Sequence, residues 1–385
     1  MKNYYVIFGI LVILANCFAS IYNYEVSTDS TDSFDIASFR VNIHDSIEIV
    51  KGVYFYCPLE YSDMRYYAED TIRFHCAIDQ QFAIMGARLD NMDMSSGIGE
   101  TVFEALSAIA DSSGHDELRY APLFLEGFSW GGQWAYSFTT AYPERVIGFC
   151  TQKGGRHDST FTLAHINVPG YMIIGELDLD YRLTNLTNIF EEHREYGALW
   201  ALAIQPGSGH SAITDRDFLD TWFHSIVELR LPVFVDDSFP ELITIDESYG
   251  YLGNRESIAI GQWVCFDELD RNDASWLPDR ANAIYWQAFV SESLITDTIA
   301  CESTIIEETN HSQVHYSNSN FFTDEITLSA NSGIIGIYNL EGRQIFDCDC
   351  EKNIIWKPSW AIPSGIYFAQ FLDNSIKPMK IVYLK

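Results

Sequence analysis

Two periods of apolar residues alternate along the middle of this chain. Short continuous apolar runs, typical of strands buried on both faces, recur at 52–56, 83–88, 123–126, 145–150, 169–174 and 199–204. Between them, amphipathic segments of helical period occur at 68–81, 100–110, 184–196 and 215–228, and another ends at residue 142. This alternation predicts an α/β fold with a mostly parallel sheet and helices on both faces.

The pattern changes towards the C-terminal end. Residues 291–318 are rich in Ser, Thr, Asn and Glu, which predicts a linker. Strand-like runs then occupy 326–329, 333–338, 366–371 and 379–384 without helical period, so we expect residues 319–385 to form a small all-β domain. Residues 236–290 carry two partly apolar segments, 274–278 and 281–290. We interpret them as an extension packed back onto the α/β domain, which would then span 20–290.

A serine lies where one apolar run meets the next helical run. Segment 127–132 reads Gly-Phe-Ser-Trp-Gly-Gly, so that Ser129 has glycine two positions before it and two positions after it. At a sharp strand-to-helix turn, side chains at those two positions would collide with the strand and the helix. The motif therefore predicts that the Ser129 hydroxyl points out of the sheet, with the backbone N–H of Trp130 facing a developing oxyanion.

A serine nucleophile at neutral pH needs a histidine base, and the histidine needs a carboxylate. Asp178 follows the apolar run 169–174 and lies at a strand's carboxyl end, where open α/β sheets place their sites, although Glu176 and Asp180 are alternatives. His210 follows the next run after Gly209 and is the candidate base. The order Ser, Asp, His differs from the chymotrypsin and subtilisin orders.

Other histidines carry no assigned role. We interpret His75, His193 and His224 as surface or helix residues. His157 and His165 follow the run 145–150 and could line the same edge of the sheet, but a histidine in a polar loop usually has no catalytic role.

These motifs resemble the α/β-hydrolase family over residues 40–235, and more specifically its secreted bacterial esterase-like members. The resemblance implies a sheet of about eight strands and a Ser129, Asp178, His210 triad. One departure concerns the oxyanion hole, because many relatives have His-Gly after the third strand and this chain has Cys57-Pro58. The second backbone donor could come from Leu59, our first choice, or from Glu60 or Tyr61.

The implied activity is hydrolysis of carboxylic esters through an acyl-enzyme. A serine peptidase or amidase of the same fold is an alternative, and a catalytically weak surface-binding protein is another. Only about 15 residues, 154–168, separate the sixth and seventh predicted strands, which disfavours a large lid. An open site favours polymer-linked esters or esters on polysaccharides, and Trp130 could offer a flat apolar contact to an acyl or sugar group.

The two ends of the chain indicate where it works. Residues 1–19 contain Lys2 and then an apolar run, and they end in Cys17-Phe18-Ala19, with small residues at positions minus three and minus one of the expected cleavage site. This pattern predicts a secretory signal peptide. Three spaced motifs, at 337–343, 363–368 and 380–385, resemble the sorting domain of the type IX secretion system of Bacteroidota-like bacteria. This resemblance implies that the secretion machinery is a partner and that the protein is secreted or held at the cell surface. A generic β-sandwich accessory or carbohydrate-binding module is the alternative.

Composition narrows the partners further. The formal net charge is −31, which disfavours nucleic acid and anionic membranes as partners. No later segment reaches 18 continuous apolar residues, so we expect no membrane span in the mature chain. No Cys or His cluster has zinc-like spacing, and we expect neither a metal nor a cofactor. Of eight cysteines, seven follow Cys17 within the signal segment, an odd number that leaves at least one thiol free or intermolecular.

Overall fold

The computed structural model divides the chain into two compact units, Met1–Glu302 and Ser303–Lys385. In the first unit it describes residues 19–28, 33–154, 163–214, 216–232 and 239–291. In the second it describes 321–322, 326–329, 333–338, 344–350, 353–358, 365–371 and 379–383. The signal peptide, apart from its last residue, and nearly all of the linker that the sequence predicts lie outside the described residues, as does His157.

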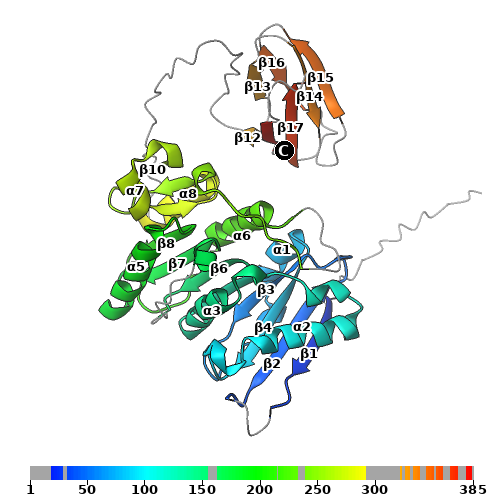
Figure 1. Ribbon diagram of the computed structural model, residues 1–385, viewed down its shortest axis with the longest axis vertical. Coiled ribbons are helices and arrows are strands. Elements are labelled where there is room, and N and C mark those ends of the chain that lie inside the picture. The colour runs from blue at the N-terminus through cyan, green and yellow to red at the C-terminus, as the bar shows by residue number, and fades with distance from the viewer. Residues whose placement is uncertain are drawn as a thin grey trace, which may run out of the picture. The chain divides into compact units, whose positions relative to one another are not determined.

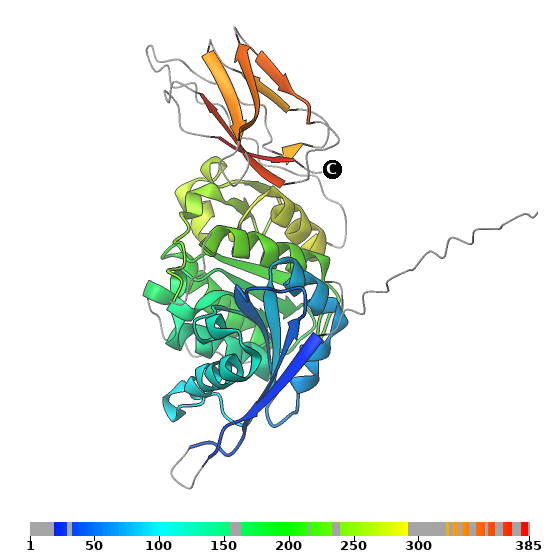
Figure 2. The same cartoon turned by 90° about the vertical axis from the view of Figure 1, so that its right-hand side faces the viewer.

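The first unit is built on an eight-stranded sheet (Figure 1). Its strands in spatial order are β1 (Ala19–Glu25), β2 (Ala37–His44), β4 (Phe82–Leu89), β3 (Gly52–Cys57), β5 (Leu123–Phe128), β6 (Val146–Gln152), β7 (Gly170–Gly175) and β8 (Trp200–Gln205). From β4 to β8 all neighbours are parallel, and only β2 runs antiparallel to both of its neighbours. Figure 2 looks onto this antiparallel edge, drawn in blue. The mostly parallel sheet confirms the predicted α/β-hydrolase fold class.

Helices cover both faces of the sheet, as predicted. The longer ones are α1 (Thr71–Asp79), α2 (Glu100–Ser113), α3 (Trp130–Ala141), α5 (Asp180–Arg194) and α6 (Asp217–Arg230). Shorter turns are α4 (Leu163–Ile166), η1 (Arg65–Glu69), η2 (Met94–Ser96), η3 (Asp116–Arg119) and η4 (Pro143–Arg145).

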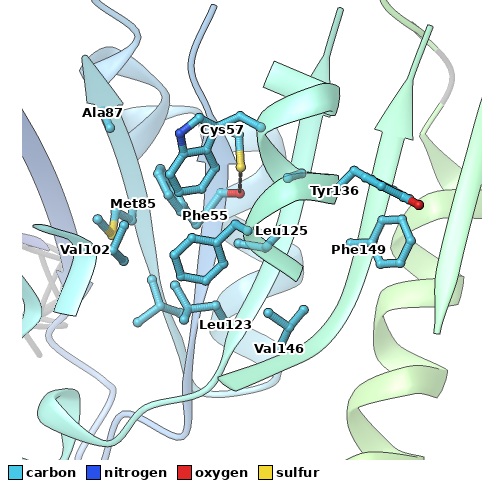
Figure 3. Packing of buried hydrophobic residues seen from close by; sticks show 14 of the residues in the cluster. Phe55, Cys57, Met85, Ala87, Val102, Leu123, Leu125, Tyr136, Val146 and Phe149 are labelled. Atoms are coloured by element: carbon cyan, nitrogen blue, oxygen red, sulfur yellow. Dashed lines mark hydrogen bonds between the residues drawn. The ribbon is translucent and has the colours of Figure 1, made fainter. Parts of the chain in front are cut away.

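Two apolar clusters hold these layers together. Alternate residues of a strand belong to different clusters: Phe55 packs with α2, α3 and α5 on one face, whereas Tyr54 packs with α1 and α6 on the other. Figure 3 shows part of the first cluster, where Met85 of β4 and Phe149 of β6 lie near side chains of α2 and α3. Burial on both faces explains why these strands appear in the sequence as continuous apolar runs.

Three local features differ from the predicted elements. The edge strand β1 and its neighbour β2 were not predicted, and the burial pattern of β1 shows no fully buried position, so its sequence lacks a strong apolar signal. The predicted helix 68–81 is two elements, because Asp70 ends η1 and its side chain caps α1 by accepting a hydrogen bond from the Ile72 N–H. The last predicted helix begins at Asp217 rather than at 215.

A further segment, 239–291, lies against β8. It contains β9 (Tyr251–Gly253), β10 (Ile260–Gln262), β11 (Ser275–Leu277), α7 (Glu268–Asp273), α8 (Arg280–Ser291), η5 (Glu247–Tyr249) and η6 (Trp263–Cys265). The Ser275 hydroxyl accepts from the Leu202 N–H and donates to the Leu202 carbonyl, both at 2.9 Å. The indole N–H of Trp286 donates to the same carbonyl at 2.8 Å. The segment thereby satisfies backbone groups of β8 that face away from β7.

The second unit is all-β in its described residues. One sheet has the order β12 (Phe321–Phe322), β18 (Met379–Tyr383), β17 (Gly365–Phe371), β14 (Gly333–Tyr338) and β15 (Gln344–Cys350). A separate pair joins β13 (Ile326–Ser329) to β16 (Asn353–Trp356). All four predicted strands are present, and β12, β15 and β16 were not predicted. Within the described residues of the whole chain, no helix is long and apolar enough to cross a membrane.

Candidate active site

Ser129 lies in a strained turn between β5 and α3. Its backbone has φ 53° and ψ −117°, a conformation that residues with a side chain rarely adopt. A Cβ on Gly127 would lie 2.1 Å from the Gly131 carbonyl oxygen, and one on Gly131 would lie 2.5 Å from the Cys57 carbonyl oxygen. Glycine is therefore needed at both positions for the reason that the sequence motif suggested.

The strain at Ser129 predicts a stability difference between two variants that both lack the hydroxyl. We expect Ser129→Gly to be more stable than Ser129→Ala by about 1 kcal/mol. The reason is that relief of strain of about 1 to 3 kcal/mol exceeds the entropic cost of glycine, about 0.5 to 1 kcal/mol. Urea denaturation of both variants measures this difference. A glycine variant no more stable than the alanine variant would show that the turn stores no strain.

The structure brings the three predicted side chains into one hydrogen-bonded chain. His210 Nε2 lies 2.9 Å from Ser129 Oγ, and His210 Nδ1 lies 2.7 Å from Asp178 Oδ2. The side chain of His210 is 28% exposed, whereas that of Asp178 is 1% exposed. The imidazole thus bridges a solvent-accessible hydroxyl and a buried carboxylate, which is the geometry of a general base.

Burial and partners distinguish Asp178 from the two alternative acids. Asp178 Oδ1 accepts from the Leu179 N–H and from Arg182 Nη1, each at 2.7 Å, so both carboxylate oxygens are engaged. Glu176 is exposed, and its side chain accepts from the Gly207 N–H at 2.7 Å. Asp180 is the exposed first residue of α5. In this geometry Asp178 is the carboxylate that contacts His210.

The partners of Asp178 keep it ionised. Its burial acts to raise the pKa, but hydrogen bonds from His210, Arg182 and Leu179 outweigh that effect and leave the pKa below its ordinary value. The carboxylate therefore remains negative at neutral pH and can stabilise an imidazolium on His210.

The oxyanion side of the site is partly defined. Trp130 opens α3, where backbone N–H groups lack partners within the helix. The Cys57 and Pro58 carbonyls lie 2.5 and 3.0 Å from the position of a Cβ on Gly131, so the loop after β3 lies beside the start of α3. The Tyr61 N–H already donates to the Leu89 carbonyl at 3.2 Å. Leu59 and Glu60 therefore remain as candidates for the second donor.

Two tryptophans follow the nucleophile. Trp130 is half-buried and packs against the core, with part of its surface exposed beside Ser129. Trp134, one turn later, is fully buried between Phe55 and Phe138, at ring distances of 5.4 and 5.0 Å. Trp134 is thus a packing residue, and Trp130 as a substrate contact remains a prediction.

Sequence reasoning missed a buried ionic cluster directly before the elbow. Glu126 is fully buried on β5, and each of its oxygens accepts hydrogen bonds from both Arg73 and Arg216, at 2.6 to 3.1 Å. It also accepts from the Tyr54 hydroxyl at 2.6 Å and from Gln152 Nε2 at 2.7 Å. Burial acts to raise the pKa of Glu126, but the two arginines hold it far below its usual range. The one sequence feature that could have indicated this cluster is the glutamate at the end of the apolar run 123–126, since a buried carboxylate needs charged partners.

Two further histidines in the described part of the chain, His193 and His165, lie apart from this hydrogen-bonded chain. His193, predicted to be a surface or helix residue, lies on helix α5 and is fully buried, stacked on Trp200 at a ring distance of 4.4 Å. His165 is also buried, 5.1 Å from the same ring, and does not line the exposed edge of the sheet.

Cysteines in the described part of the chain are of two kinds. Cys57, Cys76 and Cys150 are free and buried, and Cys265 is in a disulfide. Among the described residues, no group of three or more His, Cys, Asp or Glu side chains is arranged to hold a metal ion.

Comparisons with known proteins find similarity to solved structures, but no match to a family model or a curated protein. Among solved structures, esterase PE8 is 15% identical, with 47% of this chain and 94% of that chain covered and a TM-score of 0.36. An acetyl xylan esterase from Aspergillus awamori is 10% identical, with 53% and 99% covered and a TM-score of 0.41. A ferulic acid esterase is 13% identical, with 56% and 97% covered and a TM-score of 0.38. At TM-scores below 0.5 these likenesses carry no information on what this chain hydrolyses.

Proposed function

We propose that this protein is a serine hydrolase that cleaves carboxylic esters through an acyl-enzyme. The observation that carries the proposal is the continuous chain of hydrogen bonds from Ser129 through His210 to Asp178, with the serine on a strained elbow at the N-terminus of α3. A structural serine needs neither a histidine on its hydroxyl nor a backbone conformation that costs free energy.

The geometry assigns each residue a step. His210 Nε2 takes the proton of Ser129 Oγ as the oxygen attacks the ester carbonyl, and Asp178 stabilises the resulting imidazolium. The Trp130 N–H and a donor from the loop after β3 stabilise the oxyanion, each typically contributing about 3 to 4 kcal/mol. The imidazolium then protonates the leaving alkoxide. A water molecule then gives one proton to His210 as its oxygen attacks the acyl carbon. His210 returns that proton to Ser129 Oγ as the bond between Oγ and the acyl carbon breaks, which releases the acid.

The proposed substrates are esters attached to polymers or polysaccharides outside the cell. Support comes from the short connection between β6 and β7, part of which lies outside the described residues, and from the exposed part of Trp130. We further propose that the signal peptide in residues 1–19 and the β-rich unit at 319–385 direct secretion through the type IX system. The support for this route is the sequence resemblance alone.

A fluorophosphonate probe tests the proposed activity, because it reacts only with an activated serine. We expect stoichiometric labelling of Ser129 in the purified full chain, mapped by peptide mass, and no labelling of Ser129→Ala. An unlabelled wild type would favour the surface-binding alternative.

Labelled protein that hydrolyses peptides but no ester would favour the peptidase or amidase alternative. A panel of acyl esters, acetylated xylan, feruloyl sugars and aliphatic polyesters then identifies the substrate class.

A further inference from the structure

A buried lysine lies next to the histidine-bearing loop. Lys153 directly follows β6, is fully buried, and has φ 53°, a left-handed conformation rare for a residue with a side chain. Its backbone N–H donates to the Ile173 carbonyl at 2.7 Å, which anchors this conformation to β7. A strained backbone and a buried cation at one position point to a role beyond filling space.

The Lys153 ammonium reaches the start of the histidine loop, which we define as residues 206–214. Its Nζ donates to Gln205 Oε1 at 2.9 Å, at the end of β8, and to Ser208 Oγ at 2.6 Å, two residues before His210. These charge-assisted bonds tie the end of β8 and the loop after it to the residue that follows β6, across the intervening strand β7.

The preceding residue holds the other end of the same loop. Gln152 Oε1 accepts from the Ile213 N–H at 3.3 Å, while its amide nitrogen donates to Glu126. The Gln152 carbonyl accepts from the Ser129 N–H at 2.8 Å. Two consecutive residues therefore connect the nucleophile's turn with both ends of the loop that carries the base.

The charge of Lys153 also lies within reach of the acid. Burial lowers the pKa of Lys153, and the Asp178 carboxylate acts in the opposite direction, which places the two charges close enough to interact. Among the described residues, further charged groups near His210 and its loop include Arg182, which is paired with Asp178, and Glu176, which accepts from Gly207. The Glu126–Arg216 pair contacts Gln152 at the other end of the loop.

We propose that Lys153 is a positioning residue that holds His210 within hydrogen-bond distance of Ser129 through its bonds to Ser208 and Gln205. This inference rests on the proposed serine hydrolase function. The alternative is that Lys153 only stabilises the fold, in which case its loss would lower stability and leave turnover by the folded protein unchanged.

The test uses Lys153→Met in the full chain, because methionine keeps most of the volume and removes the donor. We expect kcat for an activated ester to fall about 10- to 100-fold, since a small displacement of a catalytic group costs on this order. We expect KM to change less than about twofold, because Lys153 contacts neither reacting atom. Lys51→Met is the matched control. It makes the same chemical change directly before β3, at the amino-terminal end of a parallel strand and away from the carboxyl ends that carry the site, and kcat should not change.

A double-mutant cycle with Ser208→Ala separates positioning from general stability. If Lys153 acts through Ser208, the single losses in kcat will overlap and the double variant will be little slower than Lys153→Met alone. Losses that multiply, or a Lys153→Met protein with wild-type kcat, would overturn the role of Lys153 while leaving the proposed function intact. A wild type that neither turns over esters nor reacts with the fluorophosphonate would instead overturn both.

Discussion

Replacing Ser129 with alanine should lower kcat for an activated short-chain ester by about 10⁶-fold, and His210→Ala should cost about as much. The losses are this large because the hydroxyl and imidazole act as one unit at 2.9 Å, and either one alone is a poor catalyst. For the same reason the double variant should be no slower than either single variant. Initial rates, corrected for spontaneous hydrolysis, measure all three.

Replacement of the acid, Asp178, should lower kcat less than replacement of Ser129 or His210. Asp178→Asn keeps the shape of the side chain but removes its negative charge, and a loss of about 10⁴-fold in kcat is expected from the wrong imidazole tautomer and an unstabilised imidazolium. Asp180→Asn is the matched control two residues away, and it should retain wild-type kcat because Asp180 is exposed at the start of α5. Equal activities of the two variants would show that Asp178 is not the acid.

Replacing Glu126 with glutamine should lower the free energy of unfolding at pH 7 by about 3 to 5 kcal/mol. Glutamine has the same size, but it leaves Arg73 and Arg216 buried without the carboxylate that each contacts through both of its oxygens. Asp70 and Asp220 also pair with these arginines, which places the expected loss towards the lower end of this range. Urea denaturation measures the loss. Tyr54→Phe serves as the comparison, because it removes the hydroxyl that donates to Glu126 and accepts from Arg216 but keeps all three charges, and it should cost about 1 to 2 kcal/mol.

The pH dependence of this difference has a defined sign. The folded pKa of Glu126 lies below the unfolded value, so its contribution is fully present above the unfolded pKa of about 4.3 and is lost as the pH falls towards the folded pKa. The gap in stability between wild type and Glu126→Gln should therefore be constant above about pH 5 and shrink below about pH 4. A gap that widened in acid would contradict an ionised Glu126.

The sequence pattern was sufficient to predict the central sheet and the turn at Ser129, because both depend on local residues. Strands buried on both faces must be apolar throughout, and the elbow must have glycine where Gly127 and Gly131 approach neighbouring backbone. Once the strands were placed, the carboxyl ends of β5, β7 and β8 had to meet at one edge. That constraint brings Ser129, Asp178 and His210 together without any knowledge of side-chain contacts.

The features that escaped prediction depend on partners distant in sequence. Glu126 is separated from Arg73 by 53 residues and from Arg216 by 90, and no periodicity reveals which charges will share one interior. Lys153 has polar partners 52 and 55 residues away, from β8 and the histidine loop. The edge strand β1 was missed for another reason, since a strand with little burial does not need an apolar sequence.

Three free thiols among the described residues of the first unit can report chemically on the two faces of the sheet. Burial raises the pKa of the Cys57, Cys76 and Cys150 thiols well above their ordinary value, so almost none is present as the reactive thiolate. Cys57 lies in the cluster with α2 and α3, whereas Cys76 and Cys150 lie in the cluster with α1 and α6. The rate of alkylation of Cys57 therefore measures how often the helical layer on one face of the sheet opens. The alkylation rates of Cys76 and Cys150 measure the same for the layer on the other face. Equal rates would show that the first unit unfolds cooperatively, and different rates would show that its two helical layers unfold separately.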